Sequence, residues 1–389
     1  MEEKKLVKPK IIRTSTIAMS LNILLKGQLQ FLSKKQEVIG ASSAGDGLNE
    51  VSTREGVRTI AVEMERGISP LKDFVSLVRM FLLFRKEKPL LVHSITPKAG
   101  LITMLAGKLA GVPIRIHTFT GLIFPYRTGL LQKILIAMDR LLCWSATTIF
   151  PEGEGVKKDL QKFKITSKPL QIIANGNVNG IDTSFYDKQL IPHEEGARIR
   201  EKLGIKSSDF VYVFVGRLVS DKGINELISA FEQIKDTSVH LILVGPYENE
   251  DPLKEQTVHT INQSKTIHAV GFQKDVRTYF SIANALVFPS YREGFPNVVL
   301  QAGAMSLPCI VTDISGSNEI ISHNENGIIV PVKNQEALHL AMKTLIEDKE
   351  LYNKLQSRSR MMIQSRFEQH MVWQAIQEQY DKLLNTIKK

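Results

Sequence analysis

Residues 289–301 read PSYREGFPNVVLQ, and they follow the apolar run 285–288. The apolar run has the length of a buried strand, the polar turn after it carries Glu293, and Pro296 stands where the first residue of a helix would fall. Another apolar run, 308–312, comes after this helix. The stretch therefore predicts a strand, a turn, a helix and a second strand, which is half of a nucleotide-binding fold.

The start of this predicted helix is suited to an anion. The amides of Asn297, Val298 and Val299 would lie in the first turn, where helical amides have no partner within the helix. The positive end of the helix dipole adds to their attraction for negative charge. We therefore expect the turn to favour a phosphate or a developing negative charge.

Short apolar runs alternate with helical patterns along the whole chain. The predicted strands are 11–14, 38–41, 58–62, 90–93, 114–119, 146–150 and 170–173 in the first half, and 210–215, 240–244, 267–270, 285–288, 309–312 and 327–330 in the second. Such alternation is typical of parallel sheets with helices on both faces. Turn-forming residues at 175–182 and a polar stretch to about 208 indicate a linker. We expect two α/β domains, each a Rossmann-like doubly wound parallel sheet, with ligands bound in a cleft between them.

The composition is that of an ordinary globular protein, because 43% of the 389 residues are hydrophobic and 23% are charged. Cys143 and Cys309 lie in no metal-type spacing, so we expect two reduced thiols in a cytosolic protein. The N-terminus lacks the apolar core of a signal peptide. No apolar run reaches the roughly 18 residues that span a bilayer.

The positive charge is confined to the first half of the chain. Residues 1–190 hold 28 Lys and Arg against 16 Asp and Glu, whereas the remainder holds 22 against 24. Segments 71–85 and 127–140 interleave this charge with apolar residues at helical spacing. They are either core-facing amphipathic helices with solvated basic edges or surfaces that dock on an anionic membrane. Basic charge without an interleaved recognition motif is weak support for a nucleic-acid partner, so none is expected.

Two further turns in the second half fall at strand ends. Residues 216–223 read GRLVSDKG. The guanidinium of Arg217 can donate two parallel hydrogen bonds to one anion, and the ammonium of Lys222 adds a compact positive charge. Gly245 with Pro246 forms another tight exit from a strand. Together with Glu293, these residues are the candidates for the functional site.

The order and spacing of these pieces resemble the retaining glycosyltransferases of family 4, which have the two-domain GT-B fold and build capsular, O-antigen and other surface polysaccharides. The matching pieces are Gly216 and Arg217 with Asp221, Lys222 and Gly223; Gly271 and Phe272 with Asp275 and Val276; residues 293–297; Gly303 with Pro308; Asn326 and Gly327 with Pro331; and, in the first half, residues 117–121 and 179–182. The resemblance covers nearly the whole chain. It implies an acceptor-binding domain, residues 1–190, completed by a C-terminal helix at about 366–389, and a donor-binding domain, residues 191–365.

The resemblance also implies roles for single residues. Arg217 and Lys222 match the pair that binds the diphosphate of a nucleotide sugar and stabilises its charge as the glycosidic bond breaks. Glu293 matches the carboxylate that holds hydroxyls of the donor sugar, although it could also cap the following helix. The remaining donor-binding positions are Gly216, Gly245, Phe272, Gly294, Phe295, Pro296, Asn297, Val298 and Gln301.

Two positions depart from the family pattern. The family has a second glutamate at the position of Gln301, where it accepts hydrogen bonds from the nucleotide ribose, and a glutamine amide oxygen retains that ability with less strength. Many members place a histidine at the position of Thr120. His117 is the nearest histidine, and it is a candidate catalytic residue, with a core histidine as the alternative.

The resemblance implies a metal-independent hexosyltransferase without a cofactor. No pair of aspartates two residues apart, as metal-dependent transferases use on the diphosphate, exists in the sequence. A hexose or N-acetylhexosamine would pass from a nucleoside diphosphate sugar, UDP before GDP, to a lipid-linked saccharide acceptor. The enzyme would be cytoplasmic and peripherally associated with the inner face of the cell membrane.

Two other functions of the same fold remain as alternatives. A nucleotide-sugar epimerase shares the fold, but its own histidine and carboxylate positions are not recognisable in this sequence. A non-catalytic nucleotide-sugar binding subunit is suggested by Gln301 alone. An oxidoreductase is disfavoured because no strand is followed by the spaced glycines of a dinucleotide-binding loop.

Overall fold

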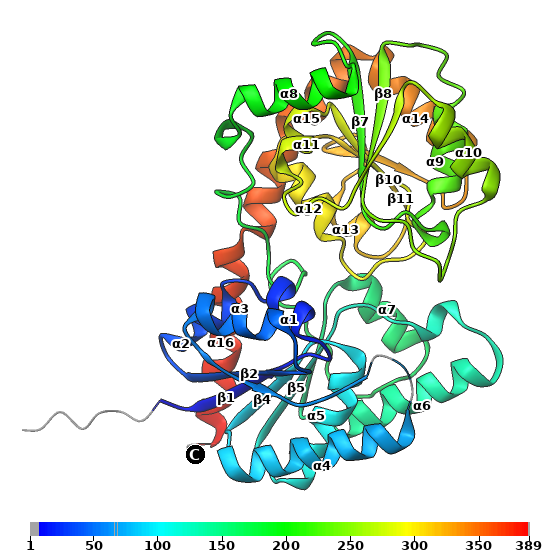
Figure 1. The fold of residues 1–389 in the computed structure, drawn as a ribbon. Helices are drawn as coiled ribbons and strands as arrows, with labels where there is room; N and C mark the ends of the chain where they lie inside the picture. Colours follow the sequence, from blue (N-terminus) through cyan, green and yellow to red (C-terminus); the bar gives the residue numbers. More distant parts are fainter. Residues whose placement is uncertain (1–7, 66, 68, 388–389) are drawn as a thin grey trace, which may run out of the picture. The chain divides into compact units, whose positions relative to one another are not determined.

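Two six-stranded parallel sheets carry the fold of residues 8–65, 67 and 69–387, the part of the chain that the computed structural model describes (Figure 1). The strand orders are β3-β2-β1-β4-β5-β6 and β12-β11-β10-β7-β8-β9. Both are the order of a doubly wound dinucleotide-binding sheet. The prediction of two Rossmann-like parallel-sheet domains is therefore confirmed.

The first sheet consists of β1 Lys10–Thr14, β2 Glu37–Ser42, β3 Arg58–Ala61, β4 Leu91–Ser94, β5 Ile114–Phe119 and β6 Thr148–Pro151. The helices around it are α1 Ala18–Leu24, α2 Gln28–Ser33, α3 Asp46–Glu55, α4 Pro70–Glu87, α5 Pro97–Leu109, α6 Gly129–Ser145, α7 Glu154–Lys162 and α16 Gln369–Ile387, with a 3-10 turn, η1, at Phe124–Tyr126. The two faces of the sheet are covered by two separate clusters of buried hydrophobic residues. Successive side chains along a strand point to opposite faces of the sheet, so they belong alternately to one cluster and the other.

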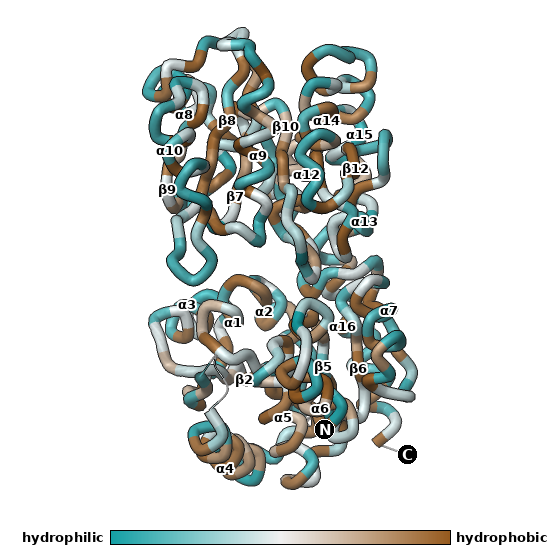
Figure 2. Tube along the Cα trace, turned by 90° about the vertical axis from the view of Figure 1, so that its right-hand side faces the viewer, coloured by the Kyte–Doolittle hydropathy of each residue, from teal (hydrophilic) through white to brown (hydrophobic). Residues whose placement is uncertain are grey.

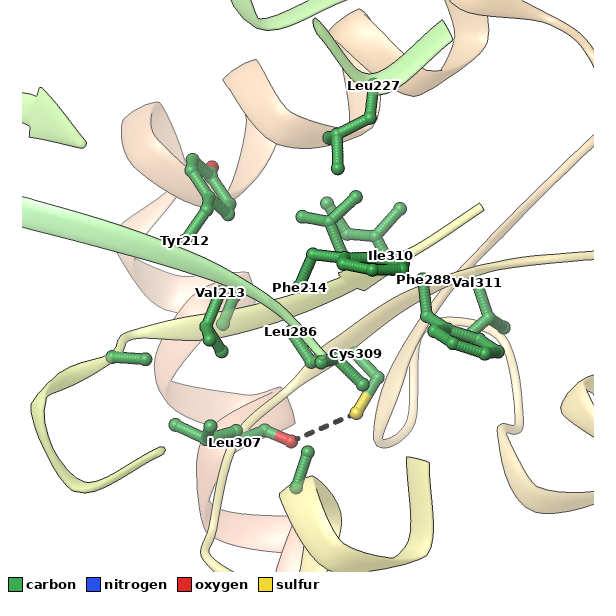
Figure 3. Close-up of a cluster of buried hydrophobic side chains, with 14 of the residues drawn as sticks. Tyr212, Val213, Phe214, Leu227, Leu286, Phe288, Leu307, Cys309, Ile310 and Val311 are labelled. Atoms are coloured by element: carbon green, nitrogen blue, oxygen red, sulfur yellow. Dashed lines mark hydrogen bonds between the residues drawn. The ribbon is translucent and has the colours of Figure 1, made fainter. Parts of the chain in front are cut away.

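The second sheet consists of β7 Phe210–Val215, β8 Val239–Val244, β9 Ile267–Gly271, β10 Ala285–Phe288, β11 Cys309–Thr312 and β12 Gly327–Val330. The helices around it are α8 His193–Leu203, α9 Ile224–Phe231, α10 Glu255–Gln263, α11 Arg277–Ile282, α12 Asn297–Ala304, α13 Ser317–Ile320, α14 Gln335–Glu347 and α15 Lys349–Phe367, with 3-10 turns η2 at Lys188–Leu190 and η3 at Ser220–Lys222. Side chains from β7, β10 and β11 meet in its core (Figure 3). The rings of Phe214 and Phe288 stack there with centroids 5.9 Å apart.

The chain divides into two units that are not consecutive in sequence. Unit 1 runs to Gly180 and takes up the chain again at Gln369, whereas unit 2 is Ile181–Glu368. The boundaries therefore lie at 180 and 368, compared with 190 and 365 in the expectation from sequence. The returning helix α16 packs Val372, Ile376 and Tyr380 into the core of unit 1.

Two local predictions were wrong. Residues 170–173 do not form a strand, because only Leu170 bridges Ile149 of the edge strand β6, and Pro169 has no amide with which to extend a ladder. Pro296 is the N-cap of α12 rather than its first helical residue, since its ψ of 106° is not helical.

Candidate active site

The candidate site lies where the strand order of unit 2 reverses. β7 and β10 are paired neighbours, and from them the chain proceeds to β8 on one side and to β11 on the other. Loops after two such strands diverge at their carboxyl ends and leave room for a ligand. Gly216 and Arg217 follow β7, and the turn with Glu293 follows β10.

Lys222 and Glu293 form an ion pair between these two loops. Each side chain is only 16% exposed, so the pair is shielded from bulk water. The Lys222 ammonium also lies 5.6 Å from the centroid of the Phe288 ring, which belongs to the core beneath. The structure thus brings together a cation and a carboxylate that lie 71 positions apart in sequence.

Arg217 lies on the same side of the sheet with its side chain about half exposed. Its Nη1 donates a hydrogen bond to Oε2 of Glu248 at 2.7 Å. Burial lowers the pKa of Arg217, but Glu248, Asp221 and Glu293 more than offset this effect, so that the pKa is raised. The guanidinium is therefore permanently charged, and Glu293 acts on it as well as on Lys222.

A second ion pair holds the two loops together. Arg292 donates from Nη2 to Oδ2 of Asp221 at 2.7 Å, and the amide of Tyr291 donates to the Asp221 carbonyl at 2.9 Å. The Tyr291 hydroxyl donates to Oε2 of Glu226 at 2.5 Å. Sequence reasoning missed these partners and Glu248, since contacts between distant loops leave no local periodic signal.

Gly223 lets the loops approach each other. Its φ is +71°, and a Cβ on it would lie 2.1 Å from the carbonyl oxygen of Pro289. A side chain would therefore be strained by the backbone and would also collide with the loop that carries Glu293.

The first turn of α12 differs in part from the prediction. The amide of Val299 donates to the carbonyl of Pro296 at 3.1 Å, so it is not an open anion donor. Phe295 is buried and meets the ring of Phe367 at 5.5 Å, which leaves only its backbone to face a ligand. Asn297 and Val298 remain half-buried at the surface of this turn.

The other donor-binding candidates lie along the same edge of the sheet. Gly216 and Gly245 touch through their backbones, since a Cβ on Gly245 would lie 1.8 Å from the Gly216 carbonyl oxygen. Phe272 follows β9 and is 73% exposed, which makes its ring available for stacking. Gln301 lies on α12 and is half-buried.

His117 belongs to unit 1 and is 1% exposed on β5. Its Nδ1 and the Ser94 hydroxyl are 2.8 Å apart, and its ring packs edge-on against Phe119. Burial lowers the pKa of His117 to about 3. These are the features of a neutral core histidine, so its catalytic role stays a prediction that its location does not favour.

No group of three or more His, Cys, Asp or Glu side chains suited to a metal ion occurs in the described ranges 8–65, 67 and 69–387. Metal independence itself stays a prediction. Cys143 and Cys309 are both free and buried.

The fold and this site define a class of protein. Two doubly wound sheets, with charged loops at the switch point of the second one, are the architecture of the GT-B fold. The most similar solved structures include Alr3699/HepE from Anabaena in complex with UDP, which superposes with a TM-score of 0.81 over 97% of this chain and 100% of that chain at 17% identity.

Sequence comparison identifies the family. The family model described as "Glycosyl transferases group 1" matches residues 196–362, and the family model described as "Glycosyl transferase 4-like domain" matches residues 36–176. The capsular polysaccharide biosynthesis glycosyltransferase CapM of Staphylococcus aureus is 31% identical over 96% of this chain and 97% of its own length. The UDP-Gal:alpha-D-GlcNAc-diphosphoundecaprenol alpha-1,3-galactosyltransferase of Escherichia coli is 27% identical over 74% of each chain. The chain belongs to the group 1 glycosyltransferases, as the resemblance of its motifs indicated, and it is an enzyme of that family.

Proposed function

We propose that this enzyme is a retaining, metal-independent hexosyltransferase of surface polysaccharide synthesis. It moves a hexose or N-acetylhexosamine from a nucleoside diphosphate sugar, with UDP as the preferred nucleotide, to a saccharide on a lipid carrier. The observation that carries the proposal is the cluster of Arg217, Lys222 and Glu293 at the switch point of the second sheet.

The cluster supplies the charges that such a reaction needs. As the bond between the sugar and the diphosphate breaks, its electrons pass to the phosphate oxygen, and Arg217 and Lys222 stabilise the negative charge there. Glu293 accepts hydrogen bonds from hydroxyls of the donor sugar and fixes its orientation. The acceptor hydroxyl then attacks the same face, and its proton passes to the leaving phosphate.

Ligand binding would exchange the partners of the two cations. In the structure, Lys222 is paired with Glu293 and Arg217 with Glu248. A diphosphate carries more negative charge and more acceptor oxygens than a single carboxylate, so it competes with Glu293 and Glu248 for charge-assisted hydrogen bonds from the two cations. Glu293 is then released toward the sugar hydroxyls.

The relatives support the choice of substrates. The name of the E. coli enzyme specifies a UDP-sugar donor and an acceptor on diphosphoundecaprenol, and the Anabaena protein binds UDP in its crystal structure. The CapM name specifies capsular polysaccharide biosynthesis. We assign Gln301 to the nucleotide ribose, as the family pattern implies.

Substitution of the cations tests the proposal. Arg217→Ala and Lys222→Ala should each reduce kcat for transfer from a UDP-sugar to a lipid-linked acceptor by about 10²- to 10³-fold. The matched control is Lys343→Ala, because Lys343 is an exposed cation of α14 paired with Glu347 at 3.7 Å. Near wild-type transfer by both site variants would refute the mechanism. Incubation with the donor alone should leave it unchanged, whereas an epimerase would convert it.

The proposed acceptor requires the enzyme to work at a membrane surface, and unit 1 carries a surface of suitable chemistry. Helix α4 turns Met80, Leu83 and Phe84 into the core, and its partly buried Leu77 and Phe81 pack against that core. On its other face a second apolar stripe is exposed to solvent, consisting of Leu71, Phe74, Val75, Val78 and Leu82. Core packing therefore accounts for only half of the apolar residues of this helix.

Helix α6 has the same property. Leu130 is 74% exposed and Trp144 is 62% exposed, and Leu131, Ile134 and Leu141 are exposed between them. In Figure 2 much of the tube along α4, α5 and α6 is brown, the colour of hydrophobic residues. Exposed apolar side chains in this number mark an interaction surface on this unit.

Basic residues flank the apolar ones. Arg79 and Arg85 of α4 and Lys133 and Arg140 of α6 are all exposed, and the first 190 residues contain 28 basic side chains against 16 acidic ones. No helix among the described residues is long and apolar enough to cross a membrane. We propose that α4 and α6 lie on an anionic bilayer, with the apolar stripes in the interface and the cations at the lipid headgroups.

Vesicle flotation tests this docking. The double variant Leu71→Ser with Phe74→Ser should lower partitioning onto vesicles of phosphatidylglycerol and phosphatidylcholine in equal parts by about 100-fold or more, because each buried side chain of this kind contributes about 1.5 kcal/mol or more. Leu340→Ser with Met361→Ser is the matched control, since both residues are exposed on helices of unit 2. Equal binding by the two double variants would contradict the assignment.

A further inference from the structure

A groove in unit 2 lies at the edge of the second sheet that is opposite to the candidate active site. Its lining residues come from 188–192, from α8, from 205–207, and from the end of α11 with residues 283–284. Residues 205–207 precede β7 and Asn284 precedes β10, whereas Arg217 and Glu293 follow the same two strands. The groove has a volume of about 580 Å³, which is the size of a small-molecule site, and it is separate from the Arg217, Lys222 and Glu293 cluster.

Arg200 of α8 places a fixed positive charge in the wall of this groove. Its Nη1 donates to the Lys206 carbonyl at 2.6 Å, and its Nη2 donates to the Ile282 carbonyl at 2.7 Å. The charge of Asp209 acts on Arg200, but that carboxylate accepts from the Lys206 amide at 2.8 Å and does not line the groove. The hydrogen bonds of Arg200 therefore hold its guanidinium in place without neutralising it.

Lys188 adds a second cation to the groove. Partial burial, followed by the charge of Arg200, lowers the pKa of Lys188, so the two cations act on each other. Among the residues that the structure describes, neither cation forms an ion pair, and the Lys188 ammonium has no hydrogen-bond partner. Glu201 is the acid of the lining, and it is exposed. An anion held between Lys188 and Arg200 would remove their mutual repulsion.

The other lining residues supply a hydrogen-bond donor and an apolar surface. Oδ1 of Asn284 accepts from the Val211 amide at 2.8 Å, which leaves the Nδ2 end of this side chain, a donor, for a ligand. Ile205, Ile282 and Ala283 are buried and expose only a small apolar surface to the groove. Cations and an amide donor beside apolar carbon suit an anion that carries an apolar group.

We propose that this groove binds a small organic phosphate, with the phosphate between Lys188 and Arg200 and the apolar part of the ligand against Ile205 and Ile282. A phosphate monoester carries a charge of about −1.5 to −2 near pH 7. Two cations match this charge, whereas a carboxylate would neutralise only one of them.

Calorimetric titration of the full chain with phenyl phosphate tests the proposal. The parent protein carries Arg217→Ala and Lys222→Ala, so that the cations of the candidate active site do not contribute to phosphate binding. Adding Lys188→Ala should raise the Kd for phenyl phosphate by about tenfold or more, the effect of one lost hydrogen bond between charged groups. Lys202→Ala is the matched control and should leave the Kd unchanged, because Lys202 is an exposed cation of the same helix that does not line the groove.

Three further titrations of the parent series separate the parts of the proposed site. Inorganic phosphate and benzoate should both bind the parent more weakly than phenyl phosphate does, since the first lacks the apolar group and the second lacks one charge. Ala197→Trp should abolish binding with both cations intact, because Ala197 is an exposed residue of α8 whose enlargement fills the groove.

Several results would overturn the proposal. Equal Kd values for the Lys188→Ala and Lys202→Ala variants would show that phenyl phosphate binds elsewhere, and so would undiminished binding by Ala197→Trp. Inorganic phosphate or benzoate that binds as tightly as phenyl phosphate would refute the ligand class. Absence of phenyl phosphate binding to the parent protein would refute the site itself.

Discussion

Replacing Tyr380 with phenylalanine should destabilise unit 1 by an amount that the structure defines. The Tyr380 hydroxyl on α16 accepts a hydrogen bond from Arg13 Nη1 at 3.1 Å and lies 2.6 Å from His93 Nδ1. All three side chains are buried, and Arg13 has no exposed surface. Phenylalanine keeps the ring and removes both contacts, of which the one to a charged group is worth about 1.5–3 kcal/mol and the neutral one about 0.5–1.5 kcal/mol.

The expected loss is therefore about 2–4 kcal/mol, which corresponds to a drop in Tm of about 5–15 °C for a unit of this size. Arg13 would keep only its bond to Gln28 Oε1 at 2.6 Å, since Nε and Nη2 have no hydrogen-bond partner among the described residues. Scanning calorimetry of the full chain measures the shift. Tyr352→Phe loses two longer bonds between neutral groups, one donated to the Asn284 carbonyl and one accepted from the Gln356 amide, each 3.2 Å long, so it should shift Tm by less. A shift below about 1 °C for Tyr380→Phe would refute the reasoning.

Three further predictions concern the active site and the pH response. Glu248→Gln should tighten UDP binding by about two- to fivefold and leave uridine binding unchanged, because the Arg217–Glu248 pair is partly exposed and worth about 1 kcal/mol or less; equal effects on both ligands in a titration would contradict competition with phosphate. Gly223→Ala should destabilise the protein by several kcal/mol and abolish transfer, whereas Gly204→Ala, with a similar φ of +68° and nothing within 4 Å, should cost about 1–2 kcal/mol in a urea melt; equal costs would show that the contact with Pro289 is unimportant. Burial lowers the pKa of His117 to about 3 in the folded chain, whereas the unfolded chain has the usual histidine pKa of about 6.5. Between these two values only the unfolded chain binds the proton, so the free energy of unfolding is retained above pH 6.5 and falls by up to about 1.4 kcal/mol per pH unit below pH 6.5. Urea melts of His117→Gln should show a shallower fall, and an unchanged slope would oppose this explanation.

Local patterns in the sequence predicted most of the fold. Apolar runs of strand length and helical periodicity located the strands of both sheets, because each buried strand has to be apolar on both faces in a doubly wound domain. The pattern was misleading at 170–173, where an apolar run lies beside the edge strand β6 and forms a single bridge.

The charged residues of the site were recognisable for a different reason. Arg217, Lys222 and Glu293 follow strand ends directly, so their position along the chain indicates their position on the sheet. The partners of these residues were not predictable. Asp221 with Arg292 and Glu248 with Arg217 are contacts between separate segments, and only tertiary packing decides them.

The return of α16 to unit 1 has a consequence for the order of events during synthesis. Unit 2 contains all of its residues once Glu368 has been made, whereas unit 1, whose sheet is encoded first, still lacks α16. Until that helix arrives, the hydroxyl that bonds Arg13 and His93 is missing, and the apolar surface that α16 covers is open to water. The first unit to be translated is therefore the last to complete its core, because α16 leaves the ribosome after every residue of unit 2.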